Sequence, residues 1–381
     1  MVLLKGLTWD HPRGRAGLEA TAEAYHRTHP EVEVRWETRT LHEFGDQPLD
    51  RVAGCYDMLI VDHPFAGFMA RTGCVVPLDE RMPKEFLDEQ ARNSVGPSFR
   101  SYAFANHQWA LAVDAAAQVS AYRPDLMGFP PQTWVEMVRL LEDKLRRRVV
   151  TPLLPVDAIS SFLTLCANLG SPVFKGQHAV DGRAGMQALR ILRSLASGGH
   201  PDSLHLNPPR TLEMMAQTDA VVYSPLLYGY SNYSRDGFRD HVIKFANIPS
   251  SGAGPRGSNL VGAGLAISST SKHVEECVEY AMYVADAETQ RGIYFEAGGQ
   301  PGHRGAWEDP SVNAASNGFF RDTLQTLEEA YLRPRHDGYE LLQIEAGELI
   351  HSFLSEEKDA TRTLDRLEAL YQERRKTWGS G

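Results

Sequence analysis

Short apolar runs alternate with amphipathic stretches along the first part of the chain. Residues 2–8 (VLLKGLT) and 56–61 (YDMLIV) are apolar runs of strand length, and residues 32–38 alternate apolar with charged side chains, as a half-buried strand does. Between them, residues 16–26 place alanine and tyrosine at nearly helical spacing. This alternation of strands and helices predicts an α/β layer fold.

The middle of the chain joins two such units. Residues 109–113 (WALAV) read as a strand, Asp114 as a short crossing, and residues 119–122 as a second apolar run. The segment RPDLMGFPP then breaks the pattern, and a helix opens at Thr133. Farther on, residues 224–234 (SPLLYGYSNYS) predict an irregular, tyrosine-rich loop after a strand that ends at Tyr223, because proline and glycine interrupt it.

Length and charge narrow the class of protein. A chain of 381 residues is long enough for two domains. Its net charge of −10 argues against nucleic acid as a partner, and no apolar run is long enough for a membrane-embedded protein. The four cysteines lack CxxC spacing and sit within apolar runs, so they predict buried free thiols without a zinc or redox role. No cofactor is expected.

The first residues, MVLLKGLTWDHP, do not have the pattern of a signal peptide. The sequence as it stands therefore predicts a cytoplasmic protein. If Met1 is an artificial start, a periplasmic or cell-surface location is expected instead.

Several motifs occur in a fixed order along nearly the whole chain. They are AYHRTHPEVEV at residues 24–34, GCVVPLDE at 73–80, the strand, YRPDL turn and PPQTW helix start within 107–137, and GAGLAISSTSKHVEECVEYAMYV at 262–284, followed by GGQPGHR. In this order they resemble the family 1 extracellular solute-binding proteins, the carbohydrate-type receptors of ABC importers.

The resemblance implies a fold and a function. The fold is the two-lobed type II periplasmic-binding-protein architecture, each lobe a sheet flanked by helices, with a multi-segment hinge. Residues 1–112 and 261–308 are expected to form the N-terminal lobe, and residues 113–260 and 309–381 the C-terminal lobe. A monomer would capture a small polar ligand, a sugar or sugar derivative, by hinge closure, and the membrane subunits of an ABC importer would be its partners if it is exported.

Ligands of open α/β sheets bind beyond the carboxyl ends of the strands. The residues at these positions are aromatic, acidic or basic, which suits a polyhydroxylated ligand. The candidate ligand-binding residues are Trp9, Asp10, His11, Asp62, His63, Phe65, Asp114, Tyr223, Tyr228, Tyr230, Gly262, His303 and Arg304.

Some of these candidates also have a purely structural interpretation. Trp9 can plug a lobe, Asp10 and Asp62 can cap helices, and Asp114 can hydrogen-bond the backbone of a hinge.

Two other functions stay open at this point. A cytoplasmic enzyme on the same fold would use His11, Asp62, His63 and Asp114 as acid–base residues, although no nucleophile motif such as GxSxG is present. A cytoplasmic ligand sensor is the third. A metal site formed by Asp10, His11, Asp62 and His63 is a less favoured alternative to plain ligand binding.

Overall fold

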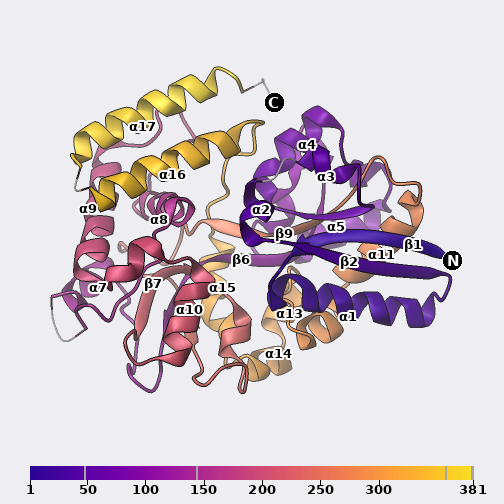
Figure 1. The fold of residues 1–381 in the computed structure, drawn as a ribbon, viewed down its shortest axis with the longest axis horizontal. Coiled ribbons are helices and arrows are strands. Elements are labelled where there is room, and N and C mark those ends of the chain that lie inside the picture. The colour runs from indigo at the N-terminus through magenta and orange to yellow at the C-terminus, as the bar shows by residue number, and fades with distance from the viewer. Residues whose placement is uncertain (47–48, 143–144, 357, 379–381) are drawn as a thin grey trace.

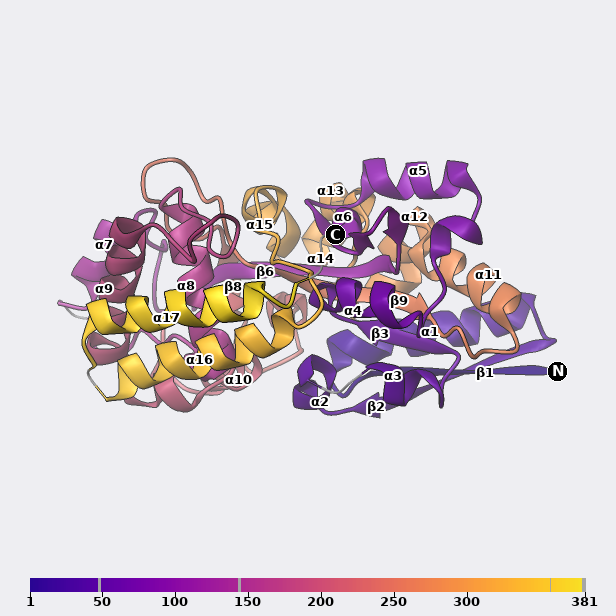
Figure 2. The same cartoon turned by 90° about the horizontal axis from the view of Figure 1, so that it is seen from above.

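The structure is a computed structural model that describes residues 1–46, 49–142, 145–356 and 358–378. Two lobes lie side by side, and strand β6 (Leu111–Tyr122) runs from one into the other (Figures 1 and 2). The sheet is seven-stranded, with the order β2-β1-β3-β9-β6-β7 and with β8 paired to β6. The predicted α/β class is confirmed.

The first lobe contains β1 (Val2–Trp9), β2 (Val32–Arg39) and β3 (Met58–Val61), which are parallel. The apolar runs of the sequence therefore became strands as expected. Strand β9 (Leu260–Ile267) returns to this lobe antiparallel to β3 and pairs with β6 on its other side. Helices complete the lobe: α1 (Pro12–Thr28), α2 (Leu41–Asp46), α3 (Leu49–Ala53), α4 (Ala66–Thr72), α5 (Lys84–Asn93), α6 (Ser98–Ser101), α11 (Val274–Ala285) and α12 (Ala287–Thr289). A two-stranded ribbon is formed by β4 (Ala103–Phe104) and β5 (His107–Gln108).

The second lobe surrounds the other half of β6 with strands β7 (Tyr223–Tyr228) and β8 (Lys244–Ala246). In Figure 1 the two C-terminal helices lie along its upper edge. Its helices are α7 (Trp134–Leu140), α8 (Pro155–Asn168), α9 (Gly182–Gly198), α10 (Pro208–Gln217), α15 (Phe319–Glu328), α16 (Tyr339–Ser355) and α17 (Ala360–Arg375). Along the chain, α13 (Arg304–Glu308) and α14 (Pro310–Ala315) come between α12 of the first lobe and α15 of the second.

Two local predictions were wrong. Asp114 does not separate two strands, because β6 is continuous and accommodates it with a register shift between Ala112 and Asp114. The tyrosine-rich segment is more regular than expected: its first half is β7, and a 3-10 turn follows at Ser231–Ser234. Pro225 is tolerated in β7 because that strand lies at the edge of the sheet.

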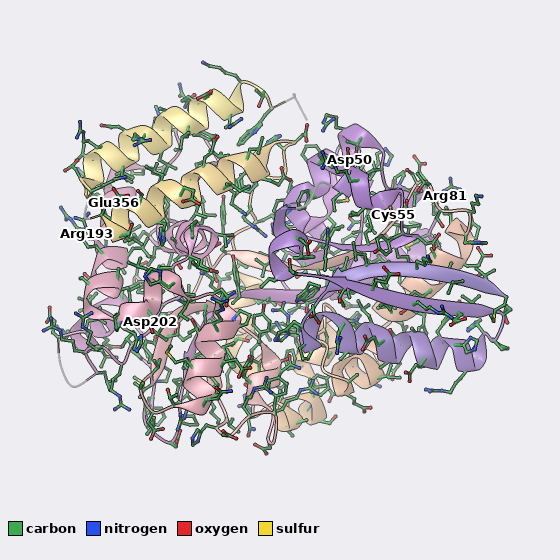
Figure 3. The ribbon with its side chains drawn as sticks, in the orientation of Figure 1. Asp50, Cys55, Arg81, Arg193, Asp202 and Glu356 are labelled. Carbon is green, nitrogen blue, oxygen red and sulfur yellow. The ribbon has the colours of Figure 1, made fainter. Side chains whose placement is uncertain are left out.

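Apolar side chains of the described residues gather in separate buried clusters. One cluster lies between α1, α11 and the strands of the first lobe, and another lies between α8, α9, α16 and α17 in the second. Charged side chains such as Asp50, Arg81, Asp202 and Glu356 cover the outside of both lobes (Figure 3).

The prediction of buried thiols holds for two of the four cysteines. Cys166 and Cys277 are buried, Cys74 is partly buried, and Cys55 is exposed at the end of α3. All four are free thiols.

Candidate functional site

His11, Asp114 and Tyr230 lie together around the side chain of Arg13 in the first turn of α1. The Arg13 guanidinium donates to both carboxylate oxygens of Asp114, at 2.8 and 2.5 Å, and to the carbonyl oxygen of Gly229 at 3.0 Å. It also lies over the ring of Tyr230, whose centroid is 4.7 Å from that of His11. This group joins the first lobe to β6 and to the segment after β7.

The pair of Arg13 and Asp114 is buried, with side-chain exposures of 4% and 0%. Burial alone lowers the pKa of Arg13, but the Asp114 carboxylate outweighs it, so the pKa lies above its ordinary value. Burial and the neighbouring Arg13 lower the pKa of His11 to about 4, so this imidazole is neutral at pH 7. Because Arg13 donates to both oxygens of Asp114, this one arginine occupies the whole carboxylate.

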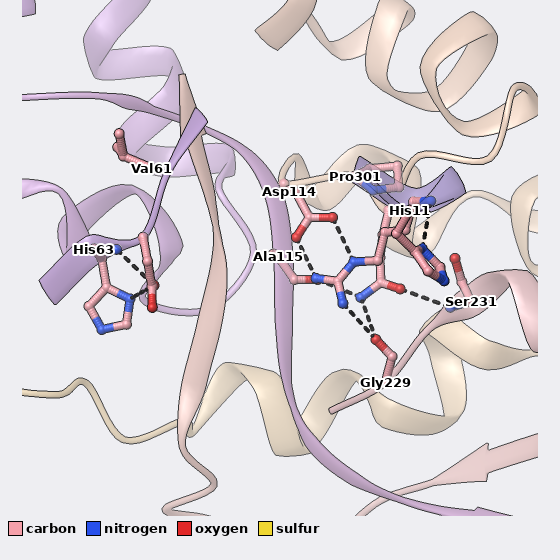
Figure 4. Close-up of polar contacts among 12 residues, drawn as sticks. His11, Val61, His63, Asp114, Ala115, Gly229, Ser231 and Pro301 are labelled. Atoms are coloured by element: carbon pink, nitrogen blue, oxygen red, sulfur yellow. Dashed lines mark hydrogen bonds and ion pairs between the residues drawn. The ribbon is translucent and has the colours of Figure 1, made fainter. Parts of the chain in front are cut away.

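Gln300 strengthens the same junction. Its amide nitrogen donates to the carbonyl oxygens of Ala115 and Gly229, at 2.9 and 3.3 Å, and its oxygen accepts from the backbone of Ser231 at 2.8 Å. Figure 4 shows this group as one network beside Asp114, apart from the group around His63.

Asp62 and His63 belong to that second group, which follows β3. The Asp62 carboxylate accepts from the backbone of His63 at 2.8 Å and from Arg333 at 2.7 and 2.9 Å. Burial alone raises the pKa of Asp62, but Arg333 outweighs it and holds the pKa well below the usual range. Burial and Arg333 lower the pKa of His63 to about 4. Asp62 is thus both the cap of the turn that follows it and the partner of a distant arginine.

Arg333 belongs to a segment, residues 331–338, that links the lobes. This segment begins beside Asn259 at the start of β9 and then crosses to the first lobe. There, the Arg335 guanidinium donates to the carbonyl oxygen of Ala103 at 2.6 Å. The carbonyl oxygen of Arg335 accepts from the backbone N–H of Gly67 at 2.8 Å. Arg333 itself is 3% exposed. The segment therefore fixes a buried cation at the boundary between the lobes.

Tyr228, at the end of β7, approaches this boundary from the second lobe. Its hydroxyl donates to Ser160 of α8 at 2.9 Å and accepts from Asn259 at 2.8 Å. Burial raises the pKa of Tyr228 to about 12, and the charges of Arg333 and Asp157 also act on it. Tyr228 therefore stands between the Arg333 group and the start of α8.

Several buried polar atoms around these groups have no hydrogen-bond partner among the described residues. Burying a polar atom without a partner is costly, so a cluster of such atoms marks a place where another molecule can supply the bonds. They are His63 Nε2, Asp157 Oδ2, Asn259 Oδ1, Arg333 Nε, Tyr339 OH and Glu340 Oε1.

Charge interactions indicate that the residues carrying these unpartnered atoms lie near one another. The charges of Arg333 and Asp62 both act on Tyr339 and on Glu340, and the charge of Asp157 acts on Tyr228. The sequence reasoning did not select Asp157, Arg333 or Glu340. No local sequence pattern marks any of the three.

The candidates in the first lobe that remain have partners of their own. Trp9 packs on Phe44, with ring centroids 5.1 Å apart, while its indole nitrogen is buried without a hydrogen-bond partner. The Asp10 side chain is 65% exposed and lies 3.7 Å from Arg15. Phe65 is buried in the turn after β3.

The other candidates lie along β6, β7 and β9 or near α13. The Tyr223 hydroxyl is 3.0 Å from Ser120, and Gly262 pairs with Ala115 across β9 and β6. The His303 ring accepts from the backbone at the start of α13, and its other nitrogen is 3.0 Å from Glu89. Arg304 forms an ion pair with Glu328 at 2.8 Å. Each of these four residues thus has a partner within the protein: a side-chain contact for Tyr223, His303 and Arg304, and strand pairing for Gly262.

No group of three or more His, Cys, Asp or Glu residues in the described chain converges in a way that could hold a metal ion. His11 lies in the Arg13 group, Asp62 and His63 lie in the Arg333 group, and Asp10 points to solvent. Within the same described ranges, no helix is both long and apolar enough to cross a bilayer.

A surface hollow of ≈620 Å³ lies on the second lobe, away from these groups. It is lined by residues 171–182 and by α17 side chains such as Leu364 and Glu368. None of the predicted site residues borders it.

No family model matches the chain. Solved structures match almost all of it. Maltose-bound MalE3 of T. maritima has a TM-score of 0.82 at 17% identity, over 98% of this chain and 99% of that one. An ABC transporter solute-binding protein of Thermotoga lettingae TMO bound with α-D-tagatose has 0.82 at 15%, over 98% and 100%. One of Agrobacterium radiobacter K84 in complex with ribitol has 0.79 at 19%, over 98% of each chain.

These likenesses show the fold. The chain has the two-lobed periplasmic-binding-protein architecture, as the sequence motifs predicted. Two of these neighbours are solute-binding proteins of ABC transporters, and all three hold a sugar or a sugar alcohol.

Proposed function

We propose that this protein is a solute-binding protein that takes a small polyhydroxylated molecule, a sugar or sugar derivative, between its lobes. The observation that carries this proposal is the set of buried, unsatisfied hydrogen-bonding atoms around Arg333 and Tyr228. Sugar hydroxyls both donate and accept hydrogen bonds, and tyrosine rings can cover the C–H faces of a sugar. The sugars and sugar alcohols bound by the structural neighbours support the same class of ligand.

The proposed ligand contacts are Asp62 from the first lobe and Tyr228 and Tyr230 from the second, with His11 beside Tyr230. We assign residues 1–112 and 261–308 to one lobe and residues 113–260 and 309–381 to the other, with β6 and β9 as the hinge. Such a ligand favours closure because it contacts both lobes only when they are together.

The proposal extends to the partner and the location. A closed, liganded form would be recognised by the membrane subunits of an ABC importer, with the protein acting as a monomer in the periplasm or at the cell surface. Membership of the family 1 extracellular solute-binding proteins is part of this proposal, and it rests on the sequence motifs.

A thermal-shift and calorimetry panel of maltose, tagatose, ribitol and mannitol tests the proposal. A ligand that binds only the folded protein at a hundredfold excess over its Kd adds about 2.7 kcal/mol of stability, which raises Tm visibly. Tyr228→Phe should weaken binding, whereas Tyr283→Phe on α11 should leave it unchanged. A folded protein whose Tm responds to no neutral sugar or polyol at millimolar concentration would contradict the proposal.

The catalytic alternative gains no support from the geometry. His11 and Asp114 lie in one group and Asp62 and His63 in the other, and each carboxylate is paired with an arginine. Arg333 holds the pKa of Asp62 well below its usual range, and both oxygens of Asp114 accept from Arg13, so neither carboxylate is free to take a proton from a ligand. We therefore propose binding without chemical conversion, which recovery of unaltered ligand by mass spectrometry would check.

A further inference from the structure

Asp157 differs from Asp62 and Asp114 because it forms no ion pair with a cation of the described residues. It lies in the first turn of α8, is 3% exposed, and has one carboxyl oxygen, Oδ2, without a partner among the described residues. Asp62 and Asp114, in contrast, each hold an arginine. The groups on which the charge of Asp157 acts are the hydroxyls of Tyr228 and Tyr230, both from the second lobe.

Burial without a counter-ion has a clear electrostatic consequence. A buried carboxylate that lacks a cation is costly, so the group keeps its proton instead. Accordingly, burial alone raises the pKa of Asp157 to about 8. A ligand that brings a positive charge to this position would supply the missing counter-ion.

Glu340 adds a second carboxyl to the same region. Its Oε1 atom is buried without a partner, and burial raises its pKa to about 8, while the charges of Asp337, Asp62 and Arg333 also act on it. Arg333 is already held by Asp62. An anionic ligand would therefore meet two carboxyls that have no ion-pair partner among the described residues, while Arg333 is already paired with Asp62.

We propose that the preferred ligand is a polyhydroxylated molecule with a basic nitrogen, an amino sugar or amino polyol, whose ammonium group pairs with Asp157. This inference rests on the proposed function and specifies its ligand. On binding, the protonated amine displaces the proton of the Asp157 carboxyl, so that an ammonium–carboxylate pair forms and one proton passes to solvent. The ring of Tyr228, on whose hydroxyl the charge of Asp157 acts, favours a cation as well.

Two matched pairs of probes test this inference: sorbitol with 1-amino-1-deoxysorbitol, and glucose with 2-amino-2-deoxyglucose. Titration calorimetry at pH 7 in two buffers of different ionisation enthalpy gives both the affinity and the number of protons released. A charge-assisted hydrogen bond predicts that an amine binds about tenfold or more tightly than its neutral counterpart. Release of close to one proton should accompany the amine alone.

Asp157→Asn keeps the shape of the side chain but removes the acid. It should abolish the proton release and cost the amine about tenfold or more in affinity, while the neutral partner changes little. Asp365→Asn on the exposed side of α17 is the matched control and should behave as the unchanged protein. The proton count of the unchanged protein tests the inference even if Asp157→Asn fails to fold.

The outcomes separate this inference from the proposed function. A neutral sugar or polyol that binds as tightly as its amine, without proton release, would overturn the inference and leave the proposed function standing. A folded protein that binds none of the four probes, nor any neutral sugar, would overturn both.

Discussion

Replacing Asp157 with asparagine should change how the stability of the unliganded protein depends on pH. In the folded protein, burial raises the pKa of this carboxyl to about 8, whereas in the unfolded chain it returns to roughly 3.9. Between these values the folded protein holds a proton that the unfolded chain has lost. The free energy of unfolding must therefore fall as pH rises.

The size of the effect follows from the proton difference. One proton held only by the folded state changes the free energy of unfolding by about 1.4 kcal/mol per pH unit. From pH 5 to pH 7 the contribution of Asp157 is thus a loss of about 2.7 kcal/mol. The stabilisation from this proton is fully present below about pH 4 and is lost by about pH 8. Glu340 has its pKa raised in the same direction, so a residual slope should remain in the variant.

Urea denaturation at pH 5, 6 and 7 measures the difference. The unchanged protein should lose about 2.7 kcal/mol more than Asp157→Asn across this range, with similar m-values in both. Asp365→Asn should follow the unchanged protein. Parallel curves for Asp157→Asn and the unchanged protein would refute the view that Asp157 is buried in its protonated form.

Three further substitutions test other parts of the structure. Asp62→Asn leaves the buried charge of Arg333 unpaired and should lower the free energy of unfolding by about 3–5 kcal/mol, measured in urea; an unchanged midpoint would show that the pair is not formed. Tyr228→Phe removes a part-buried hydroxyl with two partners and should cost about 1–3 kcal/mol in the same assay, and retention of full stability would count against that network. Gly262→Ala places a methyl group 2.4 Å from the carbonyl oxygen of Asp114 and should cost about 1–3 kcal/mol, seen as a lower Tm; an equal Tm would mean that β6 and β9 pair less closely.

Much of the fold could be predicted because its signals are local. The apolar runs at residues 2–8 and 56–61 predicted β1 and β3, since a strand of a buried parallel sheet needs apolar residues on both faces. The segment after Tyr223 was misread for an equally local reason: Pro225 and the glycine that follows β7 suggested a loop. Position at the edge of the sheet, which no local pattern reveals, makes proline acceptable there.

The sequence by itself determined the α/β class, the strands near residues 2–8, 32–38 and 56–61, and the aspartates Asp10 and Asp62 that follow two of them. Only the tertiary structure decided which charges meet. Arg13 and Asp114 are 101 positions apart, and Asp62 and Arg333 are 271 apart. Periodicity reports the burial of each element against its neighbours, whereas an ion pair depends on how distant elements are placed. For the same reason, no local pattern shows that Asp157 lacks an ion-pair partner while Asp114 and Asp62 hold Arg13 and Arg333.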